Sequence, residues 1–185
     1  PLHLIDRPDA PLPSSGIALW QPPGLPPGLD QLPQGQVHAA CGAAAALCVE
    51  AAVGAIAQRQ ATALVTAPIH KEALAAAGVR HPGHTEMLQA LAGGVPVCMM
   101  LVNEELRVVL VTIHMALRAA IEAVTFDAVL ETLRIAHRSS AAWGQELPRI
   151  AVAGLNPHAG EGVLFGTEEQ TVIAPAIAAA VAEGI

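Results

Sequence analysis

The chain has 185 residues and a formal net charge of −7, with a sequence pI near 5.5. This length suits one domain of ordinary size, and the acidic balance argues against nucleic-acid binding, which needs basic patches. The mean hydropathy of +0.48 is high, but alanine causes much of it. We therefore expect a soluble, cytoplasmic α/β protein with neither a nucleic-acid partner nor a membrane span.

Residues 1–36 form the first predicted segment and are rich in proline and glycine. One short apolar run, Gly16 to Trp20, predicts a strand, and Gln21 to Pro33 holds five prolines. Proline fixes φ and removes a backbone donor, so the proline-rich part should be an extended loop. We expect a peripheral segment over residues 1–36 and an α/β core over residues 37–185.

The first predicted helix runs from Ala39 to Ala57. It is long and apolar, but alanine drives membrane insertion weakly and Glu50 interrupts the run. A buried or dimer-facing helix is therefore the preferred interpretation. The cysteines Cys41, Cys48 and Cys98 are odd in number and lack CxxC spacing, so we expect buried, reduced thiols.

The next predicted strand, Ala61 to Val65, is followed by Lys71 at the start of a helix that ends before Gly78. The motif Pro-Gly-His-Thr-Glu (residues 82–86) lies between this helix and a further predicted helix, Thr85 to Ala92, so that His84 comes just before the start of that helix. Thr85 has two interpretations: it caps this helix, or it joins His84 and the free amides of the first turn in binding an anion. Lys71 either supports such a site or is a solvated charge.

Two apolar runs, Val95 to Val102 and Leu106 to Ile113, are separated by only three residues. Three residues are too few for a parallel crossover, so the runs predict an antiparallel hairpin and a mixed sheet. His114 follows the second run. Helices are then predicted over Met115 to Val124 and, capped by Thr125, over Phe126 to Ala141.

The last predicted strand, Arg149 to Leu155, leads into a loop that contains His158 and Glu161. Thr167-Glu168-Glu169-Gln170 then predicts a capping box and a final helix. Open α/β sheets place ligands at the carboxyl ends of their strands, where both His114 and His158 fall. Each histidine alone is more often a hydrogen-bonded or surface residue, and zinc normally takes three or four protein ligands. The pattern as a whole predicts an α/β/α sandwich with a mixed sheet.

Five motifs, in the same order and spacing, resemble the 4-hydroxythreonine-4-phosphate dehydrogenase (PdxA) family of pyridoxal phosphate biosynthesis. They are TAPIHK, PGHTE, VCMMLVNEELRVVLVTIH, RIAVAGLNPHAGEG and FGTEE. The resemblance covers about Val37 to Ile185, so the chain looks like a central fragment of the family. It implies a fold similar to isocitrate and isopropylmalate dehydrogenases, and a homodimer with the active site at the interface.

The resemblance also implies roles for particular residues. His114 and His158 match two metal ligands, while His84 and Thr85 match a substrate-binding pair, with Lys71 as a weaker addition. No catalytic residue is assigned, the dinucleotide-binding residues are unknown, and Glu161 is expected to orient a ligand rather than act as a base. A third histidine, in a motif resembling YHDQG, is absent here. Val163 stands where the family usually has glycine.

The implied activity is oxidation of 4-phosphooxy-L-threonine by NAD or NADP with a divalent metal (zinc, magnesium or cobalt). Decarboxylation to 3-amino-2-oxopropyl phosphate follows, in vitamin B6 biosynthesis. Two alternatives stay open: a paralogue that oxidises another phosphorylated hydroxy acid or a dihydrodiol carboxylate, and a non-catalytic fragment. A hydrolase is disfavoured because the sequence has no HExxH or nucleophile-elbow motif.

Overall fold

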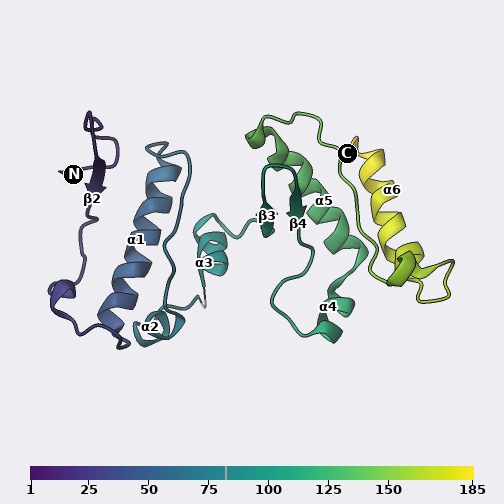
Figure 1. Ribbon diagram of the computed structural model, residues 1–185, viewed down its shortest axis with the longest axis horizontal. Helices are drawn as coiled ribbons and strands as arrows, with labels where there is room; N and C mark the ends of the chain where they lie inside the picture. Colours follow the sequence, from purple (N-terminus) through teal and green to yellow (C-terminus); the bar gives the residue numbers. More distant parts are fainter. Residues whose placement is uncertain (82) are drawn as a thin grey trace. The chain divides into compact units, whose positions relative to one another are not determined.

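The structure, a computed structural model, describes residues 1–81 and 83–185, without the side chain of Trp143. Its contacts divide the chain into two compact units, Pro1–Val95 and Pro96–Ile185 (Figure 1), which we describe separately. The predicted boundary between residues 36 and 37 falls inside the first unit. A separate peripheral segment over residues 1–36 stays a prediction.

The first unit opens with a small parallel sheet. Strand β1 (Leu2–Ile5) pairs in parallel with β2 (Ile17–Trp20), with Leu2 opposite Ile17 and Ile5 opposite Trp20. Strand β2 confirms the predicted strand, whereas the sequence analysis missed β1. The signal for β1 was weak, because only four residues, LHLI, precede the charged turn that ends it.

Three helices complete the first unit: α1 (Ala39–Ala57), α2 (Lys71–Ala76) and α3 (His84–Leu91), preceded by a 3-10 turn, η1 (Leu29–Gln31). The side chains of Ala46, Val49, Leu74 and Met87 form a buried cluster that joins all three helices. By length and composition α1 would be able to cross a membrane, a test that core helices of soluble proteins also pass. Ala46 and Val49 of α1 pack in this cluster, but only 22% of an 18-residue window of the helix is buried, so the buried or dimer-facing helix stays a prediction.

The expectation of buried cysteines is wrong for two of the three. Cys41 and Cys48 are exposed and Cys98 is partly buried, and all three are free thiols. Seven residues separate Cys41 from Cys48, so they share one face of α1. That face is not the one whose residues Ala46 and Val49 enter the core, which leaves both thiols in contact with solvent.

The second unit begins with the predicted antiparallel hairpin, which is confirmed but shorter than expected. Strand β3 (Met100–Val102) pairs with β4 (Arg107–Val109), with Leu101 opposite Val108. Asn103 shapes the turn, because its Oδ1 accepts hydrogen bonds from the amides of Glu105 at 2.9 Å and Leu106 at 2.7 Å. Asparagine commonly makes such bonds in turns.

Helices α4 (Leu117–Ala123) and α5 (Phe126–Ser140) follow, and α5 ends in a 3-10 turn, η2 (Ala141–Trp143). The cap predicted at Thr125 is confirmed, because its Oγ1 accepts the amide hydrogen of Ala128 at 3.2 Å. The chain then enters a short turn, η3 (Pro157–Gly160), a π-helical turn, η4 (Glu169–Ile173), and α6 (Ala174–Ala182).

Helices α5 and α6 make the core of the second unit. The buried residues of this core come from both helices: Val129, Leu130, Leu133, Ala176 and Ala180. At its edge, Arg134 of α5 donates from Nε to Glu183 at 2.8 Å and forms an ion pair with the same carboxylate. This paired contact lowers the pKa of Glu183 below its usual value. The C-terminal end of α6 is therefore fixed to α5 by packing and by charge.

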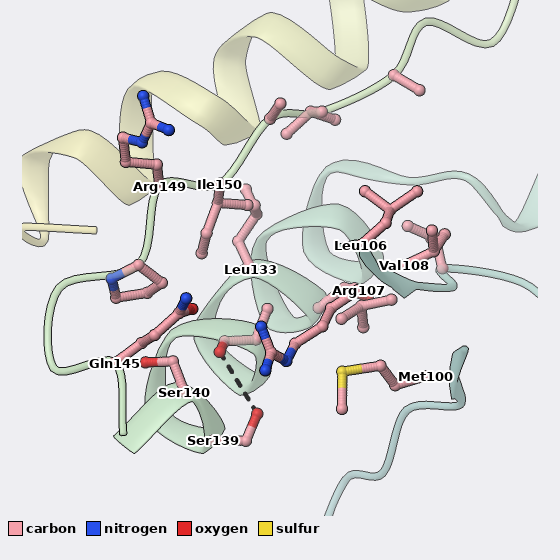
Figure 2. Close-up of a pocket in the computed structure, with 18 of the residues that line it drawn as sticks. Met100, Leu106, Arg107, Val108, Leu133, Ser139, Ser140, Gln145, Arg149 and Ile150 are labelled. Carbon is pink, nitrogen blue, oxygen red and sulfur yellow. Dashed lines mark hydrogen bonds between the residues drawn. The ribbon is translucent and has the colours of Figure 1, made fainter. Parts of the chain in front are cut away.

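Two predicted strands do not form within the described residues. Neither Ala61 to Val65 nor Arg149 to Leu155 is assigned as a strand, because a strand needs a partner ladder and these runs have none. The second run instead borders a pocket of about 990 Å³ whose other walls are β4 and α5. Figure 2 shows Ile150 and Leu133 beside this space.

Among the described residues, six other than glycine have positive φ: Arg59, His114, His158, Ala159, Glu161 and Val163. Four of the six lie in the loop that contains η3 and ends at Gly166, which we call the His158 loop (residues 156–166). Val163, at φ 79°, is the most unusual, because a β-branched residue is a genuine outlier in this region.

Gly42→Ala should destabilise the first unit. An ideal Cβ at Gly42 would lie 1.9 Å from the carbonyl oxygen of Ala73, so α1 and α2 would have to separate. We expect the free energy of unfolding to fall by about 1–3 kcal/mol, the usual cost of overpacking. Gly54→Ala is the matched control on the same helix, where a Cβ meets nothing within 4 Å. It should gain up to about 1 kcal/mol from helix propensity. Equal unfolding midpoints in urea for both variants would contradict the close approach.

Val163→Gly should stabilise the second unit, because glycine adopts positive φ without steric cost. Relief of the strain is worth roughly 1 kcal/mol after the entropy that glycine adds to the unfolded chain. The exposed Val65 is not among the positive-φ residues, so Val65→Gly is the control and should be neutral or slightly destabilising. Thermal unfolding measures both, and a lower Tm for Val163→Gly would refute the strain.

Candidate functional site

The two histidines predicted to bind metal share an unusual backbone conformation. His114 follows the apolar run that contains β4 and has φ 47°. His158 lies within η3 and has φ 53°. Left-handed conformations of residues other than glycine cost on the order of 1–3 kcal/mol each, and they concentrate at functional sites. Both side chains are solvent-exposed, so ligands can reach them.

Both imidazoles have nitrogens that are free to bind a ligand. The ring of His158 lies beside Phe165, with 6.0 Å between ring centroids and a 44° tilt. Across residues 1–81 and 83–185, neither His114 nor His158 makes a side-chain hydrogen bond. Neutral imidazole is a common ligand for divalent metals. No group of three His, Cys, Asp or Glu side chains gathers in the described residues, and a metal site formed by His114 and His158 stays a prediction.

A cluster of three polar side chains, which we call the clasp (Asn156, Glu168 and Glu169), anchors the start of the His158 loop. Oε1 of Glu169 accepts the amide hydrogens of Leu155 at 2.8 Å and Asn156 at 2.6 Å. Nδ2 of Asn156 donates to Oε2 of Glu169 at 2.9 Å and to Oε2 of Glu168 at 2.7 Å. Glu168 also accepts the amide hydrogen of Thr167 at 3.0 Å.

These hydrogen bonds keep both carboxylates of the clasp ionised. The Asn156 side chain, followed by its backbone amide, lowers the pKa of Glu169 to about 2 from the ordinary 4.5. The Asn156 side chain is also the main cause of the lowered pKa of Glu168. Because the folded-state pKa is depressed, the stability that Glu169 contributes is complete above pH 4.5 and is lost as the pH falls toward 2.

Glycine makes room for the clasp. Gly166 has φ 144°, and a Cβ there would lie 2.4 Å from Nδ2 of Asn156 and 2.6 Å from Oε2 of Glu168. A Cβ at Gly160 would lie 3.0 Å from Oε2 of Glu169. Gly160 and Gly166 therefore permit a close approach of the backbone to the clasp.

The predicted capping box at Thr167 is wrong in its bonding, although a helix does begin nearby. Glu168 is the N-cap of η4 and no side chain caps it. The amide of Thr167 donates to Glu168 instead of forming the reciprocal pair with Gln170. Sequence reasoning missed the clasp because Glu168 and Glu169 matched a local helix signal, whereas their partner Asn156 lies 12 and 13 residues earlier.

Glu161 contacts His158 through its backbone rather than through its side chain. Its amide donates to the carbonyl oxygen of His158 at 3.1 Å, and it has φ 39°. Its carboxylate is exposed and has no hydrogen bond to any described residue. The role expected for Glu161, orienting a ligand, stays a prediction.

The predicted substrate-binding residues lie in the first unit. Gly83 is the N-cap of α3, His84 is the first helical residue and Thr85 the second, so the interpretation of Thr85 as the cap is wrong. Nε2 of His84 is buried and has no hydrogen-bond partner among the described residues. Lys71 is exposed at the first position of α2, as its solvated-charge interpretation predicts.

Comparison with known proteins gives a consistent family. A sequence model described as "Pyridoxal phosphate biosynthetic protein PdxA" matches residues 17–185. The 4-hydroxythreonine-4-phosphate dehydrogenase of Beijerinckia indica is 56% identical over 151 residues, which are 82% of this chain and 45% of that protein. A Cutibacterium acnes protein, provisionally named a D-threonate 4-phosphate dehydrogenase, is 39% identical over 93% of this chain and 50% of its own length.

Solved structures agree. The crystal structure of 4-hydroxythreonine-4-phosphate dehydrogenase from Klebsiella pneumoniae superposes with a TM-score of 0.91 at 37% identity, over all of this chain and 55% of the other. The chain thus spans about half the length of the relatives it matches. These neighbours confirm the predicted fold class, which is similar to isocitrate and isopropylmalate dehydrogenases. The family model covers nearly the whole chain, and the chain therefore belongs to the PdxA family of pyridoxal phosphate biosynthetic proteins.

Proposed function

We propose that the protein carrying this chain is an NAD- or NADP-dependent, divalent-metal-dependent dehydrogenase. Its substrate would be 4-phosphooxy-L-threonine, which it oxidises and decarboxylates to 3-amino-2-oxopropyl phosphate. The observation that carries the proposal is the pair of strained, exposed histidines, His114 and His158, at the positions that match the family's metal ligands. The names of the Beijerinckia and Klebsiella relatives support the substrate. A cytoplasmic homodimer is part of the same proposal.

The residues of this chain would contribute two separate functions. His114 and His158 would hold the metal through neutral imidazole nitrogens, with further ligands from outside the described residues. When bound, a divalent metal acts as a Lewis acid on a hydroxyl oxygen, and a nicotinamide accepts hydride. His84 and the first-turn amides of α3 would bind an anionic group of the substrate and so fix its orientation.

The buried Nε2 of His84 supports its role in binding. A buried polar atom without a partner is costly, so such an atom in a native protein needs an explanation. An anionic substrate group would supply one once the imidazole turns to expose Nε2, which is covered in this structure. Lys71, exposed at the first position of α2, would add a positive charge that attracts the anion.

A second candidate substrate is a phosphorylated hydroxy acid without an amino group. The 39% identity to the Cutibacterium protein, named for D-threonate 4-phosphate, favours this alternative. A substrate panel separates the two. The proposal expects the larger kcat/KM with 4-phosphooxy-L-threonine, and a larger value with D-threonate 4-phosphate would replace it. Each assay also contains zinc, magnesium or cobalt. If neither substrate gives reduced nicotinamide with any of these metals, the non-catalytic alternative is favoured.

Removal of either imidazole should weaken metal binding by the 185-residue chain. We choose His114→Asn and His158→Asn because asparagine tolerates positive φ, so the backbone is preserved. Two ligands form only part of a coordination sphere, so binding should be weak in the parent and fall at least about tenfold in each variant. Titration calorimetry with zinc measures this. The exposed His3 is the control, and His3→Asn should bind as the parent does. Unchanged affinity in both test variants would remove the metal assignment.

His84→Ala should impair substrate binding and leave the metal content intact. Loss of one hydrogen bond to a charged group costs about 1.5–3 kcal/mol, so kcat/KM should fall by roughly ten- to a hundredfold. The assay uses the full-length protein and measures metal content in parallel. His81→Ala, three residues earlier in the chain, is the control and should retain activity. If His84→Ala lost stoichiometric metal, the histidines would be assigned wrongly.

A further inference from the structure

We propose that Glu169 is a positioning residue for His158: through the clasp it sets the backbone from which the His158 imidazole reaches a metal. This inference deepens the proposed function and rests on the metal-binding role of His158. Its geometric basis is the pair of short hydrogen bonds from the amides of Leu155 and Asn156 to Oε1 of Glu169. These amides lie two and three residues before the histidine.

Glu169 is well placed to act as a fixed point. It is the first residue of η4, which continues directly into α6. Helix α6 is held to α5 by the buried side chains of Ala176 and Ala180 and by the Arg134–Glu183 ion pair. The hydrogen bonds of Glu169 therefore tie a loop on the surface to the packed helices of the second unit.

The His158 loop has little else to hold it. Its own backbone supplies short-range bonds, such as the amide of Ala159 to the carbonyl oxygen of Asn156 at 3.0 Å and that of Phe165 to Gly160 at 3.1 Å. Most of its residues are exposed. The side chains of Glu168 and Glu169, which lie outside the loop, hydrogen-bond to it at Asn156. A strained backbone conformation persists only when several contacts hold it in place. The hydrogen bonds of the clasp are such contacts for the His158 loop.

The two carboxylates of the clasp differ in what they hold. Glu169 binds two backbone amides and the Asn156 side chain, whereas Glu168 binds that side chain and the amide of its own neighbour, Thr167. Loss of Glu169 should therefore release the backbone ahead of His158, while loss of Glu168 should leave the backbone bonds of Glu169 in place. This difference makes Glu168 a matched control within the same cluster.

The test measures zinc affinity of the 185-residue chain by calorimetry, together with Tm and amide hydrogen exchange of residues 156–166. Glu169→Ala should weaken zinc binding by about tenfold or more, as is typical when the support of a metal ligand is removed. It should also speed exchange in the loop. Glu168→Ala should have a smaller effect, and Glu122→Ala, on an exposed position of α4, should have none.

A polarity reversal tests the hydrogen bonds without removing side-chain volume. In Glu169→Gln the amide nitrogen would face Nδ2 of Asn156, so two donors oppose each other and zinc binding should weaken. Adding Asn156→Asp and Glu168→Gln replaces that contact by a carboxylate that accepts from both glutamines, while the amide of Thr167, outside the loop, loses its acceptor on residue 168. The triple variant should recover most of the lost affinity, which a loss of general stability would not produce. If Glu169→Ala fails to fold, the comparison of Glu169→Gln with the triple variant still tests the positioning role.

The outcomes separate this inference from the proposed function. If His158→Asn abolishes zinc binding but Glu169→Ala and Glu169→Gln leave it unchanged, the positioning role is overturned and the metal site stands. If the Glu169 variants lower Tm without changing affinity, Glu169 is structural only and the inference is again overturned. If His158→Asn binds zinc as the parent does, the proposed metal site fails, and the positioning role fails with it.

Discussion

The conformation of the His158 loop depends on one carboxylate, that of Glu169. It accepts two backbone amides and one side-chain amide, and the same bonds lower its pKa to about 2. A carboxylate that is ionised throughout the physiological range makes stronger hydrogen bonds than a neutral group. The loop can therefore maintain four left-handed residues other than glycine, including the histidine that would bind a metal.

The packed helices of each unit hold the candidate ligand-binding side chains in place. In the second unit, α5 and α6 pack through Leu133 and Ala176 and carry η4, on which Glu169 begins. In the first unit, the close approach at Gly42 lets α2 meet α1. His84 and Glu169 are thus each the first residue of an element that buries a side chain, Met87 in α3 and Ile173 in η4, an arrangement that helps to position a side chain accurately.

Local signals allowed much of the fold to be predicted. Helix α1 has its predicted bounds, Thr125 caps α5 as expected, and the hairpin of β3 and β4 follows from a three-residue connection.

The features that could not be predicted depend on residues far apart in the sequence. The run from Arg149 to Leu155 has the composition of a strand, but a strand also needs a neighbour, which no local pattern specifies. The clasp joins Asn156 to residues 12 and 13 positions later, and its acidic residues imitate a helix cap. The histidine positions were predicted from strand ends and from family motifs, whereas their left-handed backbone left no sequence signal.

The titration of Glu169 tests most directly whether the clasp exists as described. Nuclear magnetic resonance of the side-chain carboxyl carbon, with Glu169→Gln to assign the signal, gives its pKa in the folded chain. Because three hydrogen bonds stabilise the ionised form, we predict a titration midpoint near 2 if the chain stays folded at that pH. If the chain unfolds at a higher pH, the carboxyl signal should stay that of the ionised form until unfolding. A midpoint close to the ordinary 4.5 would show that the amides of Leu155 and Asn156 are not bound, and it would contradict the account of the His158 loop.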